Sequence, residues 1–170
     1  SYGDNPGGGD NPGGGDNPGG GDNPGGGTGG DSGYTYEIVF NGDAAPGGLP
    51  SGSNNGKQDG SYTISNAELV LHASTNFYWN SYDSGYLLVG KKDSYSQLPV
   101  VSGKALKKIC FKTGKNASEK VIVDVYQGST ASNVNTSALK KDTEYTWTIS
   151  GSIDTAYCLY VTNANNAQYQ

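Results

Sequence analysis

The sequence predicts an all-β protein: an antiparallel two-sheet sandwich, jelly-roll or immunoglobulin-like, preceded by a disordered or extended tail rich in Gly and Pro. Apolar and polar residues alternate in short runs from Tyr34 onward, and clusters of Gly, Asn, Ser or Pro separate these runs. No stretch has a convincing helical period. We therefore expect a tether over residues 1–33 and one β-sandwich domain over residues 34–170.

The tail repeats the hexapeptide DNPGGG four times between residues 4 and 27. These repeats contain no apolar side chain other than proline, so no burial would offset the entropy lost on ordering them. The glycine triplets act as flexible joints between prolines that favour extended or turn conformations. The repeats are therefore predicted to be a spacer that cannot fold alone.

Seven segments of the domain have the alternating pattern of strands. Their ranges are 34–40, 67–73, 85–90, 104–113, 119–127, 143–149 and 156–162, and short edge strands are expected near Tyr62 and Val100. Because side chains alternate between the two faces of a strand, one set is expected to form the core. This set contains Tyr36, Ile38, Phe40, Leu69, Leu71, Ile109, Phe111, Val121, Val123, Val125, Tyr145, Trp147, Ile149, Leu159 and Val161. The alternating residues Glu37, Glu68, Lys108, Lys112, Asp124, Glu144 and Thr148 are expected to face water.

The charge distribution argues against nucleic acid as a partner. Five Asp residues before residue 34 account for the net charge of −5, and the eleven acidic residues of the domain balance its eleven lysines. Arginine, the residue best suited to bidentate phosphate recognition, is absent. Abundant Tyr, Ser, Thr, Asn and Gly indicate an extracellular or cell-surface location, and no apolar run reaches transmembrane length.

No catalytic residue, cofactor or metal site is expected from the residue pattern. His72 is the only histidine, so a multi-histidine zinc site cannot form, and we predict a surface or rim position for it with no catalytic role. The acidic loop residues Asp43, Asp59, Asp83 and Asp154 do not have the spacing of a calcium loop. A small glycoside hydrolase that uses Glu68 and Glu144 is an alternative, because glycoside hydrolysis needs two converging carboxylates.

The stretch STNFYWNSYDSGY, residues 74–86, predicts a ligand-binding loop. Aromatic faces stack on sugar rings or peptide side chains, and neighbouring amides and carboxylates bind hydroxyl groups. The residues predicted to contact a glycan or peptide are Tyr78, Trp79, Asn80, Tyr82, Asp83 and Tyr86. Packing of these rings at the end of the sandwich is the alternative. We expect Phe77 to be packed, and Tyr78, Trp79 and Tyr82 to be exposed.

The two cysteines, Cys110 and Cys158, lie in predicted strands on the face opposite the core residues. They could meet across neighbouring strands as a disulfide, which would add about 3 kcal/mol of stability. Two unpaired thiols are the other alternative, because strand adjacency cannot be deduced from one sequence. Both alternatives remain open at this point.

Residues 85–168 resemble the β-sandwich modules of secreted and surface-attached lipoproteins of Bacteroidota. The resemblance is carried by "GYLLVGKKDSYSQLPVVSGKALKKICFKTGKN", "EKVIVDVY", "TEYTWTISG" and "CLYVTNANNAQ", with a Pro-then-Gly-Lys step before a strand and a TNA turn after the last one. The tail likewise resembles the spacer that follows the lipid-bearing cysteine of such proteins. In these modules a further short strand follows the TNA turn. Because the sequence stops at Gln170, we expect this strand to be missing or replaced.

The resemblance implies a non-enzymatic surface protein held at the outer membrane by a lipid anchor. This anchor would be its only contact with the membrane. From the aromatic stretch we expect a glycan, peptide or protein partner, and the repeated tail suggests an accessory role in an outer-membrane transport complex. A structural subunit of a surface assembly or fimbria is an alternative. Asp154, Thr155 and Ala156 also resemble the O-glycosylation motif of Bacteroidota, which would place a glycan on Thr155.

Overall fold

The computed structural model describes residues 1–3, 34–36, 45–52, 57–64 and 67–170. In these ranges the chain forms fourteen short strands and one 3-10 turn, η1 (Pro46–Gly48). All pairs between the named strands are antiparallel. The sheets pack as a sandwich, so the predicted all-β class and two-sheet architecture are confirmed.

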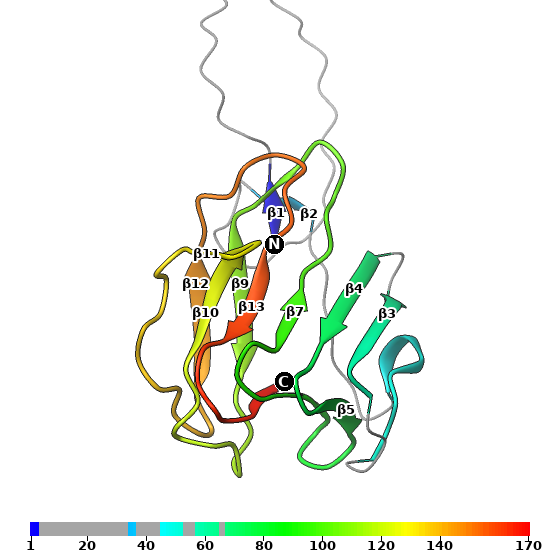
Figure 1. Cartoon of the computed structure of the whole chain (residues 1–170). Helices are drawn as coiled ribbons and strands as arrows, with labels where there is room; N and C mark the ends of the chain where they lie inside the picture. Colours follow the sequence, from blue (N-terminus) through cyan, green and yellow to red (C-terminus); the bar gives the residue numbers. More distant parts are fainter. Residues whose placement is uncertain (4–33, 37–44, 53–56, 65–66) are drawn as a thin grey trace, which may run out of the picture.

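The first layer is a six-stranded sheet (Figure 1). Its strands, in spatial order, are β11 (Thr130–Ala131), β10 (Val123–Gln127), β13 (Cys158–Val161), β7 (Tyr95–Gln97), β4 (Ala67–His72) and β3 (Asp59–Ile64). The two central strands of this sheet are β7 and β13, which pair directly although they lie more than sixty residues apart in the sequence.

Three smaller sheets cover the other side of the core. They are β12 (Glu144–Thr148) with β9 (Lys108–Lys112); β14 (Ala167–Tyr169) with β6 (Tyr86–Gly90) and β5 (Asn76–Asn80); and β2 (Tyr34–Tyr36) with β1 (Tyr2–Gly3) and β8 (Ala105–Leu106). Backbone hydrogen bonds of 3.0 and 2.8 Å between Lys112 and Gln170 connect the end of β9 to the segment after β14.

The core contains most of the apolar residues that the period-two pattern assigns to it. Both layers contribute, and the predicted residues Leu69, Leu71, Ile109, Phe111, Val121, Val123, Val125, Trp147, Ile149, Leu159 and Val161 are buried. Tyr145 is partly buried against this cluster. The predictions for Tyr36, Ile38, Phe40 and Glu37 lie outside the described side chains. Glu68, Glu144 and Thr148 are exposed as expected, whereas Lys108 and Lys112 are partly buried.

Asp124 is an exception, because its predicted exposure is wrong. Its side chain is only 3% exposed, although it lies on the outward-facing side of β10. The segment after β11 folds over it, and its carboxylate accepts hydrogen bonds from the backbone N–H groups of Asn133, Val134 and Asn135 at 2.8–3.1 Å. A buried carboxylate with three donors is satisfied without water.

Both ends of the described chain differ from the sequence expectation. Ser1–Gly3 were assigned to the tether, but Tyr2 and Gly3 form β1, and the Tyr2 phenol donates a hydrogen bond to the Pro99 carbonyl. Burial raises the pKa of Tyr2, so this phenol remains protonated at physiological pH. At the other end, β14 is a short strand after the TNA turn, so the expectation that this strand is missing or replaced is wrong.

Candidate functional site

The predicted binding stretch is a β-hairpin rather than a loop. Residues 76–80 form β5, which pairs with β6 in a register that places Tyr78 opposite Leu88 and Asn80 opposite Tyr86. The sequence NFYWN alternates, so Phe77 and Trp79 point into the core while Tyr78 and Asn80 lie on the outer face. The hairpin therefore divides the aromatic residues between two faces.

The expected exposure of these rings is confirmed only in part. Phe77 is fully buried, as expected, and packs edge-to-face on Tyr62 with ring centroids 5.8 Å apart. Trp79 is 3% exposed, so its predicted exposure is wrong. Tyr82 is 79% exposed, and Tyr78 is partly exposed. The two inward-facing rings fill the core, so the outward-facing tyrosines are the candidates for ligand contact.

The tip of the hairpin holds Tyr82 away from the domain. Asp83, Ser84 and Gly85 have positive φ angles of 57°, 65° and 82°, which turn the chain sharply. The N–H of Gly85 donates to the Tyr82 carbonyl at 3.0 Å, and the N–H of Tyr82 donates to Asn80 Oδ1 at 2.9 Å. These bonds fix the backbone on both sides of Tyr82 while leaving its ring in solvent.

Asp83 anchors the tip to the rest of the domain. Its Oδ2 accepts a 2.9 Å hydrogen bond from the backbone N–H of Lys115, and its carbonyl accepts one from the Gln170 amide. These partners lie in the turn after β9 and next to β14. Asp83 therefore fixes the position of the hairpin tip, and it also places its own carboxylate next to Tyr82.

The outer face of the hairpin combines aromatic rings with hydrogen-bonding groups. Asn80 Nδ2 donates to the Tyr86 hydroxyl at 2.9 Å. The pKa of Tyr86 is raised by burial and, to a lesser extent, by Tyr78 and Asp83. Its hydroxyl is consequently protonated at physiological pH and retains its own hydrogen for donation. We define the hairpin site as Tyr78, Asn80, Tyr82, Asp83 and Tyr86.

A second group of aromatic rings crosses the outer face of the six-stranded sheet. Four rings from the neighbouring strands β4, β7, β13 and β10 form this aromatic ladder, namely His72, Tyr95, Tyr160 and Tyr126. Their successive centroids are 5.2, 6.3 and 4.2 Å apart. This ladder was not predicted, although Tyr126 and Tyr160 alternate with the core residues Val125, Leu159 and Val161.

The aromatic ladder uses its ring faces internally. Tyr126 and Tyr160 stack with planes 14° apart, and Tyr95 is nearly parallel to Tyr160. His72, partly exposed as expected, is held by a 2.7 Å contact with Asp59. By contrast, none of the ring contacts recorded among the described residues involves Tyr78, Tyr82 or Tyr86. The aromatic ladder therefore mainly stabilises the pairing of its strands. The ring faces that remain available for a ligand are those of the hairpin site.

Tyr160 is expected to titrate well above the ordinary tyrosine value. Burial, followed by the 2.9 Å hydrogen bond that its hydroxyl donates to Asp93, raises its pKa from 10.0 to about 12. A raised folded-state pKa means that the stabilisation from neutral Tyr160 is complete below pH 10 and is lost between about pH 10 and 12. Asp93→Asn should lower the pKa of Tyr160 by removing the negative charge, while burial keeps it above 10.0. NMR titration of ¹³C-labelled tyrosine measures both values, and a wild-type midpoint near 10 would contradict the assignment.

The remaining predicted residues are separate from the hairpin site. Cys110 and Cys158 are free thiols on strands of different sheets, so the structure contains no disulfide between them. Cys110 is exposed, whereas burial raises the pKa of Cys158 to about 11. Thr155 is partly exposed, and its hydroxyl donates to the Ile153 carbonyl at 2.9 Å. O-glycosylation of Thr155 stays a prediction.

The carboxylates considered for catalysis do not share a sheet. Glu68 lies on β4 of the six-stranded sheet and accepts a hydrogen bond from Ser61, whereas Glu144 lies on β12, opposite Lys112. Within the described ranges, no group of three or more His, Cys, Asp or Glu side chains is placed to hold a metal ion. In the same part of the chain, no helix combines the length and apolar character needed to cross a membrane.

The hairpin site is thus a partly preorganised surface of three tyrosines, one amide and one carboxylate. Its chemistry suits non-covalent contact with a polar ligand that has apolar faces. Comparisons of the chain with protein-family models, with curated proteins and with solved structures found no match.

Proposed function

We propose that this protein is a non-enzymatic glycan-binding β-sandwich and that the hairpin site contacts the glycan. The observation that carries the proposal is the 79% exposure of Tyr82 on a turn whose backbone is fixed by Asn80 and Gly85. An exposed aromatic ring on a fixed backbone has only its side-chain freedom to lose on binding. Tyr82 is therefore the expected anchor of the contact.

A glycan fits the surrounding groups better than a purely apolar ligand. Sugar rings have apolar C–H faces that stack on tyrosine and hydroxyl groups that need directional partners. Tyr78 and Tyr82 supply rings, whereas Asn80, Asp83 and the Tyr86 hydroxyl supply donors and acceptors. A peptide with aromatic or proline side chains is the closest alternative ligand.

The proposed setting is the cell surface. The DNPGGG repeats, hydrated and without a core of their own, would space the binding domain from an attachment point. The resemblance to surface lipoproteins supports attachment through lipid, and the four repeats suggest an accessory role in an outer-membrane complex. In such a role the hairpin site would capture glycans for the partner proteins.

The experiment is binding of the full chain to a panel of immobilised glycans, followed by titration calorimetry with the best binder. We expect Tyr82→Ala to reduce affinity by about tenfold, which corresponds to roughly 1.4 kcal/mol, because it removes the exposed stacking face. Tyr126→Ala on the aromatic ladder is the matched control, since it removes the same side chain from the other layer. Tyr126→Ala is expected to leave glycan affinity unchanged.

Three results would contradict the proposal. Loss of binding in Tyr126→Ala but not in Tyr82→Ala would move the site to the aromatic ladder. Hydrolysis of a bound glycan that disappears in Glu68→Gln or Glu144→Gln would support the glycoside hydrolase alternative. Ordered self-assembly of the full chain without binding to any glycan would support the structural-subunit alternative.

A further inference from the structure

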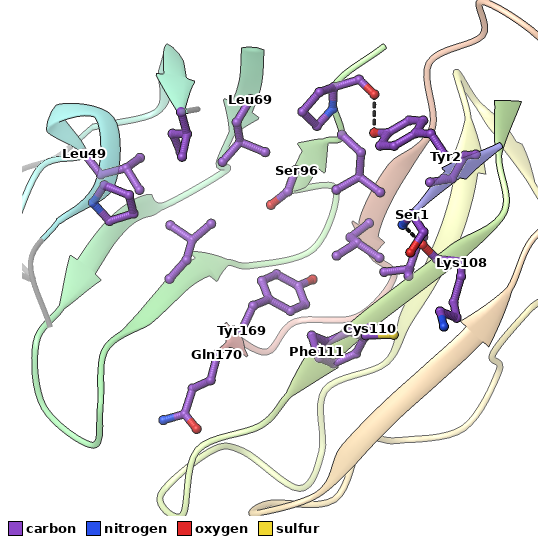
Figure 2. Close-up of a pocket in the computed structure, with 18 of the residues that line it drawn as sticks. Ser1, Tyr2, Leu49, Leu69, Ser96, Lys108, Cys110, Phe111, Tyr169 and Gln170 are labelled. Atoms are coloured by element: carbon purple, nitrogen blue, oxygen red, sulfur yellow. Dashed lines mark hydrogen bonds between the residues drawn. The ribbon is translucent and has the colours of Figure 1, made fainter. Parts of the chain in front are cut away.

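A partly open cavity of about 370 Å³ lies between residues of the six-stranded sheet and of the opposing strands. Its lining is mainly apolar and comes from both layers; Leu69, Leu87, Leu106 and Leu159 are among its members. Figure 2 shows the space, with Leu69 and Ser96 on one side and Phe111 and Tyr169 on another. The volume falls within the range of small-molecule sites, roughly 300–1,000 Å³.

Two hydroxyl groups in this cavity have no hydrogen-bond partner among the described residues. They are Ser96 Oγ on β7 and the phenol oxygen of Tyr169 on β14. Ser96 is 2% exposed and Tyr169 is 9% exposed, so bulk water does not satisfy them. Both side chains line the cavity, and burial raises the pKa of Tyr169 so that its phenol is protonated at physiological pH.

This combination is unusual for a protein interior. Folded cores pack densely and contain few spaces larger than a water molecule. Buried polar groups are paired in the great majority of cases, and each unpaired one reduces stability. Bound water stabilises a cavity best when it finds several polar partners, whereas this lining is mostly apolar. An apolar molecule with one polar group would fill the space and pair the hydroxyls.

We propose that the cavity binds an uncharged apolar molecule that carries one hydroxyl or carbonyl group, in the size class of a medium-chain alcohol. Ser96 and Tyr169 would bind the polar group, and the four leucines would contact the apolar body. Two cationic groups belong to the described lining, the Ser1 α-ammonium and the Lys108 side chain. The ammonium already donates a hydrogen bond to the Lys108 carbonyl, and the Lys108 side chain is partly exposed on β9. The groups of the lining that need a partner are neutral hydroxyls, so a neutral hydroxyl or carbonyl pairs them without the hydration loss of a buried carboxylate.

Methyl NMR of the full chain tests the proposal with 1-octanol, octane and octanoate at pH 8 as probes. We expect saturable shifts with 1-octanol at the methyl groups of Leu69, Leu87, Leu106 and Leu159, and weaker binding of octanoate. Val123, Val125 and Leu139 are the matched control methyls, because they are buried but do not line the cavity. Their resonances should move less.

The double variant Ser96→Ala with Tyr169→Phe isolates the role of the two hydroxyls. It should weaken 1-octanol binding by roughly three- to tenfold, because each lost hydrogen bond has a modest net effect, and leave octane binding unchanged. The variant removes two unpaired polar atoms, so the unliganded domain should be as stable as the wild type or more stable. Thermal unfolding checks that it folds.

Several outcomes would overturn the proposal. One is the absence of saturable 1-octanol shifts at the lining methyls in the wild type. Another is an equal loss of octane and 1-octanol affinity in the double variant. A third is a set of nuclear Overhauser contacts from Ile38 or Phe40, which lie outside the described residues, to the lining leucines. Those contacts would identify the chain itself as the occupant.

Discussion

Replacing Trp79 with alanine is expected to lower the free energy of unfolding by about 3–5 kcal/mol, the usual range for removing a large buried aromatic side chain. Trp79 is 3% exposed and belongs to the core cluster, and its backbone N–H donates to the Pro50 carbonyl at 2.7 Å. Trp79 also lines the partly open cavity between the layers, so its removal would enlarge that cavity. Urea denaturation followed by tyrosine fluorescence or circular dichroism measures the loss.

Tyr82→Ala is the matched control for this prediction, because it removes an aromatic ring three residues away that is 79% exposed. We expect its effect on stability to be within about 0.5 kcal/mol. The pair thus separates a structural ring from a surface ring on one hairpin. Wild-type stability of Trp79→Ala together with reduced glycan affinity would show that Trp79 contacts the ligand, as the sequence first suggested.

The core could be predicted from the sequence because strand periodicity is a local property. Leu69 and Leu71 recur at a spacing of two, as do Val121, Val123 and Val125, and all five are buried. Burial of one face of such a strand follows without knowledge of its neighbours. The two-sheet class follows in turn, because several such strands must bury one face each against a partner layer.

The hairpin shows where this local reasoning becomes ambiguous. In β5, the apolar rings of Phe77 and Trp79 alternate with Asn76, Tyr78 and Asn80, which is the pattern of a strand. However, the Asn, Ser and Asp residues around this segment are typical of turns. Because the alternating run is only five residues long, the sequence favours a loop as much as a strand. Composition singled out this segment for its aromatic residues, but only the observed pairing with β6 shows which rings face outward.

Contacts between distant strands could not be predicted from a single sequence. The aromatic ladder depends on β7 pairing with both β4 and β13, and these pairings specify that Tyr95 lies opposite His72 and Tyr160. Likewise, the two unpaired hydroxyls of the cavity come from β7 and β14, in different layers. Register between non-local strands is set by the whole core rather than by any local motif.

Asp124 could not be predicted for a different reason. A polar residue that alternates with core residues along a strand is normally exposed. Here the 132–137 segment folds back over β10 and brings three successive backbone N–H groups to one carboxylate. Asn135 adds two bonds from its side-chain amide, to the carbonyls of Val123 and Ser137. Asp124 therefore organises a segment that has little apolar surface of its own.

Asp124→Ala is accordingly expected to destabilise the domain by about 3 kcal/mol or more, because it leaves three backbone donors without their charged acceptor. Asp124→Asn keeps the shape and one acceptor oxygen, so a smaller loss, about 1–2 kcal/mol, is expected. The matched control is Asp142→Asn, which removes the charge of an exposed ion pair with Lys112 at 3.2 Å and tolerates the positive φ of 47° at this position. It should lose less than about 1 kcal/mol.

Urea denaturation measures the three losses, and amide hydrogen exchange locates them. The N–H groups of Asn133, Val134 and Asn135 should exchange faster in Asp124→Ala than in the wild type, while those of the distant hairpin β5–β6 keep their protection. Equal losses in Asp124→Ala and Asp142→Asn would mean that water replaces the buried carboxylate. In that case the segment over β10 would be held by Asn135 and by packing alone, and Asp124 would have no organising role.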